Sequence, residues 1–195
     1  MRKKKGLRIL LDVCLLLVLV AIDQISKFYA VTHFKEHPVT VIRHVLELCY
    51  VENHGAAFGI LQHQKVLLVF ISSVILLVIF YLIQKMPTSK KYAVIEFLFV
   101  CISAGAIGNM IDRIRLNYVI DFLYLSIISF PVFNFADICV TIPTIILVIL
   151  FLFVMKEEDF AFLSLKEKKF RKLEADSRTS SGAKKRLKKS KHMNE

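Results

Sequence analysis

The sequence predicts an all-α integral membrane protein with four transmembrane helices and a small β-containing loop region between helices 1 and 2. The 195 residues are 56% hydrophobic, with a mean hydropathy of +0.59 and no tryptophan. Such a composition is typical of a protein that crosses a membrane several times. The ~30 Å hydrocarbon core of a bilayer takes about 20 helical residues. Four apolar runs approach or exceed that length, at residues 7–31, 66–83, 92–111 and 138–155.

Lysine and arginine residues predict how these runs are oriented. Five lie in residues 1–8, three in residues 84–91 and thirteen in residues 156–195, whereas the loops at 29–65 and 112–137 hold three and two. Cytoplasmic loops carry an excess of Lys and Arg, so we expect both termini and the 84–91 turn to be cytoplasmic. Residues 1–155 then form the transmembrane domain, residues 156–195 form a basic cytoplasmic tail, and the two other loops are extracytoplasmic.

The formal net charge of +11 comes mostly from that tail. Basic runs that follow a membrane span, such as Lys184-Lys185-Arg186, more often bind anionic lipid headgroups than nucleic acid, at about 1 kcal/mol per base. We therefore expect membrane lipid as a partner and no nucleic acid.

The first apolar run is predicted to be a retained helix. A cleaved secretory signal is the alternative, but no convincing small-x-small site precedes Asp23. Toward the far end of this run, Asp23 and Lys27 are four residues apart and share a helix face. They could form no more than an interfacial ion pair in which Lys27 extends to the headgroups.

The loop at 32–65 contains β-branched stretches at 39–42 and 49–51, which predict short strands lying on the membrane face. Asn53 and Gly55 follow in a polar turn, where glycine permits close backbone approach to a ligand.

Five histidines occur in the same region, but the His33 to His37 segment lacks the His-Glu-x-x-His pattern of a zinc site. No metal is predicted.

Three aspartates, Asp112, Asp121 and Asp137, lie between the last two apolar runs. A carboxylate costs roughly 2.5 kcal/mol or more at the bilayer centre, so several near one membrane face indicate a function. Asp112 could instead be clamped by the adjacent Arg113, and Asp137 could simply be the N-cap of the last helix. Asp121 lies in an apolar stretch that should raise its pKa by desolvation.

Five short motifs occur in order along these segments: Asp23-Gln24-x-x-Lys27, Asn53-x-Gly55-x-Ala57-Phe58, Gly108-Asn109-x-x-Asp112-Arg113, Val119-x-Asp121-Phe122 and Phe133-Asn134-x-Ala136-Asp137. Together with four spans and internal termini, they resemble the bacterial lipoprotein signal peptidases (signal peptidase II), which are integral-membrane aspartic peptidases. The resemblance covers residues from about 7 to 155.

The resemblance implies that Asp121 and Asp137 form a catalytic dyad. It implies that eight residues support the dyad or bind substrate: Asp23, Lys27, Asn53, Gly55, Asn109, Asp112, Arg113 and Asn134. The loop with Asn53 and Gly55 would be a substrate cradle, and the segment before Phe133 a mobile cover. Where the family is expected to have a glycine after the final aspartate, this chain has Pro143.

The implied substrate is a diacylglyceryl-prolipoprotein, cut before its lipid-modified cysteine. The enzyme would act as a monomer without cofactor or metal in the bacterial cytoplasmic membrane, with its active site near the outer face. Two close carboxylates would share a proton, so that one acts as general base and the other as general acid, and the sequence leaves their assignment open.

Two other functions deserve comparison with this one. A proton-coupled small membrane transporter would also place carboxylates near helix ends, but four short spans without an internal repeat argue against it. A serine–lysine peptidase could use Ser26 and Lys27, yet adjacent helical positions point about 100° apart.

Overall fold

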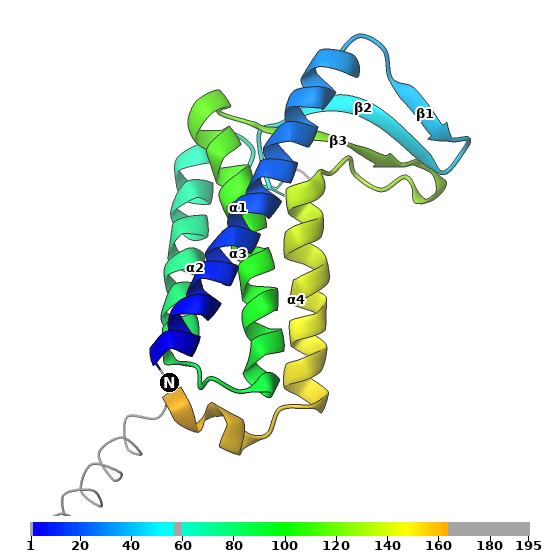
Figure 1. The fold of residues 1–195 in the computed structure, drawn as a ribbon. Coiled ribbons are helices and arrows are strands. Elements are labelled where there is room, and N and C mark those ends of the chain that lie inside the picture. The colour runs from blue at the N-terminus through cyan, green and yellow to red at the C-terminus, as the bar shows by residue number, and fades with distance from the viewer. Residues whose placement is uncertain (1, 57–59, 164–195) are drawn as a thin grey trace, which may run out of the picture. The chain divides into compact units, whose positions relative to one another are not determined.

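The computed structural model describes residues 2–56 and 60–163. Four long helices dominate it, α1 (Arg2–His33), α2 (Lys65–Lys85), α3 (Lys90–Leu116) and α4 (Phe135–Phe153) (Figure 1). All four are long and apolar enough to cross a membrane, α1 from Gly6 onward. The four predicted spans are therefore confirmed as helices of membrane-crossing length.

The chain divides into two compact units, Met1–Phe153 and Val154–Glu195. The first holds all four long helices and the sheet. In the second, the structure describes a short 3-10 helix, η3 (Glu157–Leu163). Most of the basic tail lies outside the described residues, so its boundary and its role stay predictions.

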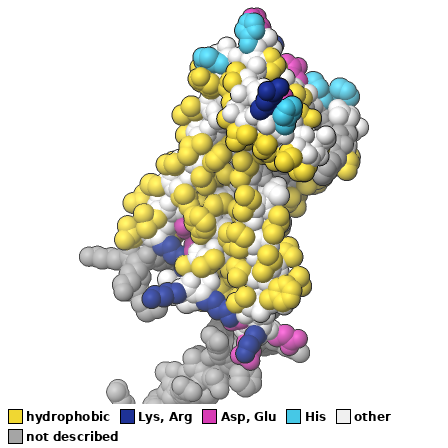
Figure 2. Space-filling view, turned by 90° about the vertical axis from the view of Figure 1, so that its right-hand side faces the viewer, with side chains coloured by type: hydrophobic (Ala, Val, Ile, Leu, Met, Phe, Trp, Pro, Cys, Tyr) yellow, Lys and Arg dark blue, Asp and Glu magenta, His cyan; other side chains and the backbone are white. Residues whose placement is uncertain are grey.

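Helix α3 is the centre of the first unit. It packs against α1, α2 and α4, and it carries the longest list of buried residues of the four helices. The other helices expose large hydrophobic side chains, including Phe28, Phe80 and Ile145. Figure 2 shows these apolar side chains as a broad band over the helices. A band of this size suits contact with lipid rather than water.

Two glycines of α3 permit its close packing. A Cβ on Gly105 would collide with the backbone oxygen of Ala136 in α4, and one on Gly108 would collide with the carboxylate of Asp23 in α1. Small residues at helix–helix interfaces let the backbones approach closely. Gly108 thereby leaves room for an acidic side chain between two helices.

A three-stranded antiparallel sheet lies at one end of the bundle, with strands in the order β1 (Val39–Ile42), β2 (Leu46–Asn53) and β3 (Val119–Leu125). Strand β1 has the predicted bounds, and β2 is longer than predicted. The sheet is not confined to the region between helices 1 and 2, because β3 comes from the connection between α3 and α4. We call this end of the bundle the sheet end (Figure 1).

The sequence analysis did not predict strand β3, because this strand is buried on both faces. Val119, Ile120, Asp121 and Phe122 are all buried, so the strand shows no alternation of polar and apolar residues. Its β-branched and aromatic composition was the available signal. Ile120 and Phe122 pack with Ala30 of α1 and with Phe34, which directly follows that helix, and these contacts fix the strand against the end of α1.

The end of α3 is also fixed. Asn117 adopts a left-handed conformation, with φ 72°, and closes the helix. Lys65 of α2 donates hydrogen bonds to Asn117 Oδ1 at 2.7 Å and to Ile114 O at 3.3 Å, which occupies two acceptors at the helix terminus. Strand β3 therefore begins just after a helix end that Lys65 holds in place.

Two features lie farther from the sheet. Arg8 of α1 forms an ion pair with Glu96, a buried residue of α3. Helix α4 continues through Pro143, which is buried within it. The departure from the expected glycine thus leaves the helix continuous.

Candidate active site

Asp121 lies in the middle of β3 and is 2% exposed. Its two carboxylate oxygens accept hydrogen bonds from two side-chain amides, Asn53 Nδ2 at 2.9 Å and Asn134 Nδ2 at 2.6 Å. Burial and, to a lesser extent, the nearby carboxylate of Asp137 together raise the pKa of Asp121 to about 7, against the opposing effect of the hydrogen bonds from Asn53 and Asn134. The sequence-based expectation of a raised pKa is thereby supported, and the group titrates near neutral pH.

Asp137 lies in the first turn of α4, but it is not the N-cap. Asn134 holds that place: its Oδ1 accepts a hydrogen bond from Asp137 N at 3.0 Å, and its own N–H donates to Asp137 Oδ2 at 3.0 Å. This reciprocal pair is a capping box with Asn and Asp in the two roles. The N-cap alternative is wrong because the chain turns into the helix earlier than the apolar run indicates.

The two carboxylates are linked by asparagines. Asn134 contacts Asp121 through its side-chain amide and Asp137 through its backbone N–H. Asn109 of α3 donates to the second oxygen of Asp137 at 2.8 Å. One carboxylate of the proposed dyad therefore comes from β3, in the connection between α3 and α4, and the other comes from the first turn of α4. All four of their oxygens accept hydrogen bonds from neutral N–H groups.

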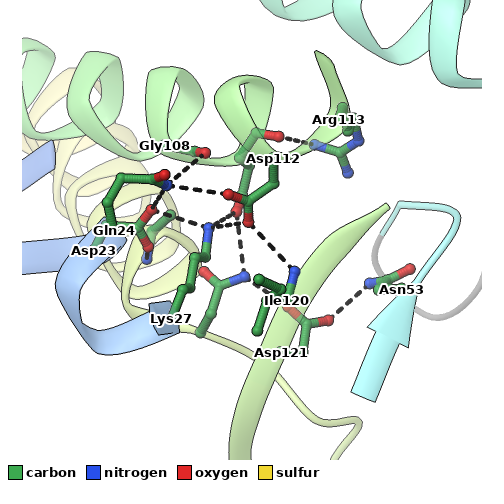
Figure 3. A network of polar contacts seen from close by, with 12 residues as sticks. Asp23, Gln24, Lys27, Asn53, Gly108, Asp112, Arg113, Ile120 and Asp121 are labelled. Atoms are coloured by element: carbon green, nitrogen blue, oxygen red, sulfur yellow. Dashed lines mark hydrogen bonds and ion pairs between the residues drawn. The ribbon is translucent and has the colours of Figure 1, made fainter. Parts of the chain in front are cut away.

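Lys27 forms a second polar cluster beside the dyad. Its ammonium lies 2.9 Å from Asp23, 2.8 Å from Asp112 and 2.8 Å from Asn109 Oδ1 (Figure 3). Lys27 is only 1% exposed, so its side chain does not extend to the headgroups. The interfacial ion-pair alternative is wrong because Gly108 and the close packing of α1 on α3 bury the pair.

Asp112 is held by Lys27 rather than by Arg113. Its oxygens also accept hydrogen bonds from Gln24 Nε2 at 3.1 Å and from Ile120 N at 3.3 Å, so it joins α1, α3 and β3. Consecutive helical positions diverge, and Arg113 consequently points to a different side of α3. The predicted alternative, in which Arg113 clamps Asp112, is therefore wrong.

Asp23 ties α1 to α4. Its Oδ1 accepts a hydrogen bond from Ala136 N at 3.0 Å, and its Oδ2 accepts one from Gln24 at 3.0 Å. Gln24 lies in the first motif but had no role in the sequence analysis. Its contacts with Asp23, Gly108 O and Asp112 show that it belongs to the same cluster.

Arg113 holds the loop that follows β2. It donates to Gly55 O at 2.9 Å and, more weakly, to Asn109 O at 3.4 Å. Gly55 N in turn donates to Asn53 Oδ1 at 2.9 Å. A Cβ on Gly55 would lie 2.7 Å from Ile60 O, so the loop requires glycine there. The motif positions at 57 and 58 lie outside the described residues.

A groove of about 1170 Å³ opens beside the dyad. Asp121, Asp137 and Arg113 contribute to its polar end. Apolar side chains of α2, α3 and α4 line the rest, among them Ile79 and Phe99, together with the segment 130–133 before α4. The two carboxylates therefore lie in the wall of a largely apolar groove.

The chain matches the family model described as signal peptidase (SPase) II over residues 15–153, which spans every motif residue. It belongs to the signal peptidase II family. This is an aspartic peptidase family, and the resemblance stated from the motifs is confirmed.

Curated relatives of this family member are named lipoprotein signal peptidase. Those of Streptococcus pyogenes serotype M5 (strain Manfredo) and serotype M18 (strain MGAS8232) are each 42% identical over 147 residues, covering 74% of this chain and 93% of theirs.

Two solved structures, titled as bacterial membrane enzymes determined by the in meso method, are also similar. One has a TM-score of 0.65 at 30% identity, covering 75% of this chain and 92% of that chain. The other has a TM-score of 0.62 at 28% identity, covering 74% and 94%.

The structure brings all ten predicted site residues of this signal peptidase II family member into one connected network. Within the part of the chain that the structure describes, the hydrogen bonds that join these ten residues involve no histidine side chain. His54 and His63 place their rings 5.2 Å apart in the loop after β2. Within the described residues, no group of three or more His, Cys, Asp or Glu side chains is arranged to hold a metal ion. The absence of a metal requirement stays a prediction.

Proposed function

We propose that this chain removes signal peptides from diacylglyceryl-modified prolipoproteins, cutting before the lipid-modified cysteine, with Asp121 and Asp137 as its catalytic dyad. One observation carries the proposal: the buried carboxylate of Asp121 and the partly buried carboxylate of Asp137 share Asn134 in the wall of an apolar groove. The names of the curated relatives point to the same substrate class. The transporter alternative gains no support, because the chain belongs to a peptidase family.

The dyad performs the hydrolysis by general acid–base catalysis. The ionised carboxylate takes a proton from water, whose oxygen bonds to the scissile carbonyl carbon while the protonated carboxyl donates to the carbonyl oxygen. When the intermediate collapses, the C–N bond breaks and the amine nitrogen takes a proton. Burial and the neighbouring Asp137 raise the pKa of Asp121 to about 7, so the pair can share one proton near neutral pH.

The groove suits a substrate that enters from the membrane. It is lined along α2 from Ser72 to Leu82, a length of roughly 15 Å at the rise of an α-helix. An apolar signal segment could lie along it with the scissile bond at the dyad. Because enzyme and lipid anchor share one membrane, much of the orientational search is removed.

The supporting residues divide into three groups under this proposal. Asn53, Asn109 and Asn134 position the carboxylates through their amides, whereas Gly55 and Arg113 shape the loop beside the groove. Asp23, Lys27 and Asp112 hold the helices that carry them.

We further propose that both termini are cytoplasmic, that the sheet end and the dyad lie at the outer face, and that the enzyme is a monomer in the cytoplasmic membrane. The distribution of Lys and Arg supports this orientation. A reporter fusion within residues 84–91 should behave as internal, and one at Pro38 as external. An internal readout at Pro38 would contradict the four-span topology.

The test of function uses the full-length protein in nanodiscs with a synthetic diacylglyceryl-modified precursor peptide. We expect one cleavage, before the modified cysteine, and much less turnover of the unlipidated peptide. Asp121→Asn and Asp137→Asn should each abolish cleavage while retaining helix content. Turnover by both folded variants would exclude the dyad, as would wild-type activity that EDTA abolishes and zinc restores.

A further inference from the structure

Three asparagine side chains deliver N–H groups to the dyad, and each is oriented by a contact on its carbonyl oxygen. Asn53 Oδ1 accepts from Gly55 N at 2.9 Å, Asn134 Oδ1 from Asp137 N at 3.0 Å, and Asn109 Oδ1 from Lys27 Nζ at 2.8 Å. An amide accepts through oxygen and donates through nitrogen, so a donor on the oxygen turns the nitrogen toward the carboxylate. Of these three contacts, those on Asn53 and Asn134 come from nearby backbone, and that on Asn109 comes from a cation of another helix. Asn109 Oδ1 also accepts a second, longer hydrogen bond from Asn134 Nδ2 at 3.2 Å.

The geometry of Lys27 makes it an unambiguous donor. An ammonium has three N–H groups and no acceptor, and here they meet Asp23, Asp112 and Asn109 within 2.9 Å. Asn109 therefore has to present its oxygen to Lys27 and its Nδ2 to Asp137, where it donates at 2.8 Å. A flipped amide would set an N–H against the ammonium and an oxygen against a carboxylate.

We propose that Lys27 is a positioning residue for the cleavage reaction, which acts through Asn109 by holding its amide N–H on Asp137 and by placing a buried positive charge beside the dyad. The inference rests on the proposed function of the dyad. It goes beyond a structural ion pair, because a structural pair would join α1 to α3 without influencing how the dyad titrates.

The positive charge of Lys27 lowers the pKa of Asp121. It thereby opposes burial and Asp137, which both raise that pKa. Removing the charge raises the pKa of Asp121 further, so the acid of the pair keeps its proton to higher pH. The alkaline limb of the pH–rate profile should then move upward by roughly one pH unit.

The experiment compares Lys27→Gln, Asn109→Ala and the double variant with wild type, in nanodiscs, with kcat and KM measured across pH. Lys27→Gln should lower kcat by roughly 10²-fold, as removal of one oriented donor does, with little change in KM and with the alkaline limb raised. Asn109→Ala should lower kcat similarly. The double variant should be no worse than Asn109→Ala, because one residue acts through the other.

Arg8→Gln is the matched control. Arg8 also joins α1 to α3 through an ion pair, with Glu96, but it lies outside the polar network of the dyad. This variant should lower the melting temperature and leave kcat and the alkaline limb as in wild type.

Three results would overturn the proposal. These are a folded Lys27→Gln with the wild-type profile, losses that multiply in the double variant, or an Arg8→Gln that shifts the alkaline limb equally. If Lys27→Gln fails to fold, Asn109→Ala decides, since it keeps both ion pairs of Lys27, and wild-type kcat in that variant would overturn the proposal. Failure of the dyad itself is read separately, from turnover by Asp121→Asn.

Discussion

Two pairs of aspartates at the sheet end differ in what neutralises them. Asp23 and Asp112 contact the ammonium of Lys27, whereas the oxygens of Asp121 and Asp137 accept from the N–H groups of neutral amides. A cation in contact favours the ionised carboxylate, but amide donors leave a carboxyl able to gain or lose a proton. General acid–base catalysis requires such exchange, so under the proposed function the second pair carries out the chemistry and the first pair holds the helices together.

Substituting one member of each pair should separate chemistry from architecture. Asp121→Asn should abolish cleavage, because general acid–base catalysis is lost, without lowering the melting temperature. Asp112→Asn should lower kcat less and the melting temperature more, because Lys27 then loses one of its two carboxylates. Turnover and thermal unfolding of both variants in the same nanodiscs give the comparison. Equal losses of kcat in two folded proteins would place Asp112 with the dyad.

Removing Glu96 should affect stability and not catalysis. Glu96 is 4% exposed and pairs with Arg8, so Glu96→Gln leaves a cation without its partner at a cost on the order of 3 kcal/mol. The melting temperature should fall while kcat at permissive temperature stays near wild type. A kcat loss comparable with that of Asp112→Asn would mean that the Arg8–Glu96 pair affects catalysis as much as the Lys27–Asp112 pair, despite its distance from the dyad.

The pH dependence of stability should sharpen the same contrast. The pKa of Asp121 is raised from 3.8 to about 7, so the folded protein binds this proton more tightly than the unfolded chain. The resulting stabilisation is complete below the unfolded value and is lost as pH rises through the folded value. The melting temperature of wild type should therefore decline between about pH 4 and pH 8 more than that of Asp121→Asn. Parallel thermal scans test this, and identical slopes would assign the decline to other groups.

The smallest effect is expected from the basic tail, which carries none of the motif residues. Truncation after Glu158 should leave cleavage of the lipidated peptide largely intact and weaken binding to vesicles that contain anionic lipid. Turnover and vesicle co-sedimentation measure the two effects. A well-folded truncated protein without activity would show that the tail takes part in catalysis.

The sequence by itself predicted the four apolar helices and the residues of the candidate site. Hydropathy is a local property, so apolar runs of bilayer length predict spans without knowledge of packing. The motifs add residue types in order, and family membership confirms that interpretation. Even the polar turn at Asn53 and Gly55 was visible, because glycine and asparagine have local conformational preferences.

Tertiary structure alone decided which partners these residues have. Asp112 bonds to Lys27 rather than to its neighbour Arg113 because α1 approaches α3 at Gly108 and brings an ammonium from 85 residues earlier in the chain. Strand β3 forms because β2 and the end of α1 cover it, although no periodicity marks it. The orientation of the Asn109 amide, and with it part of the environment of the dyad, depends on a contact with Lys27, which lies 82 residues earlier in the chain. Spacing along one helix carries no information about such contacts.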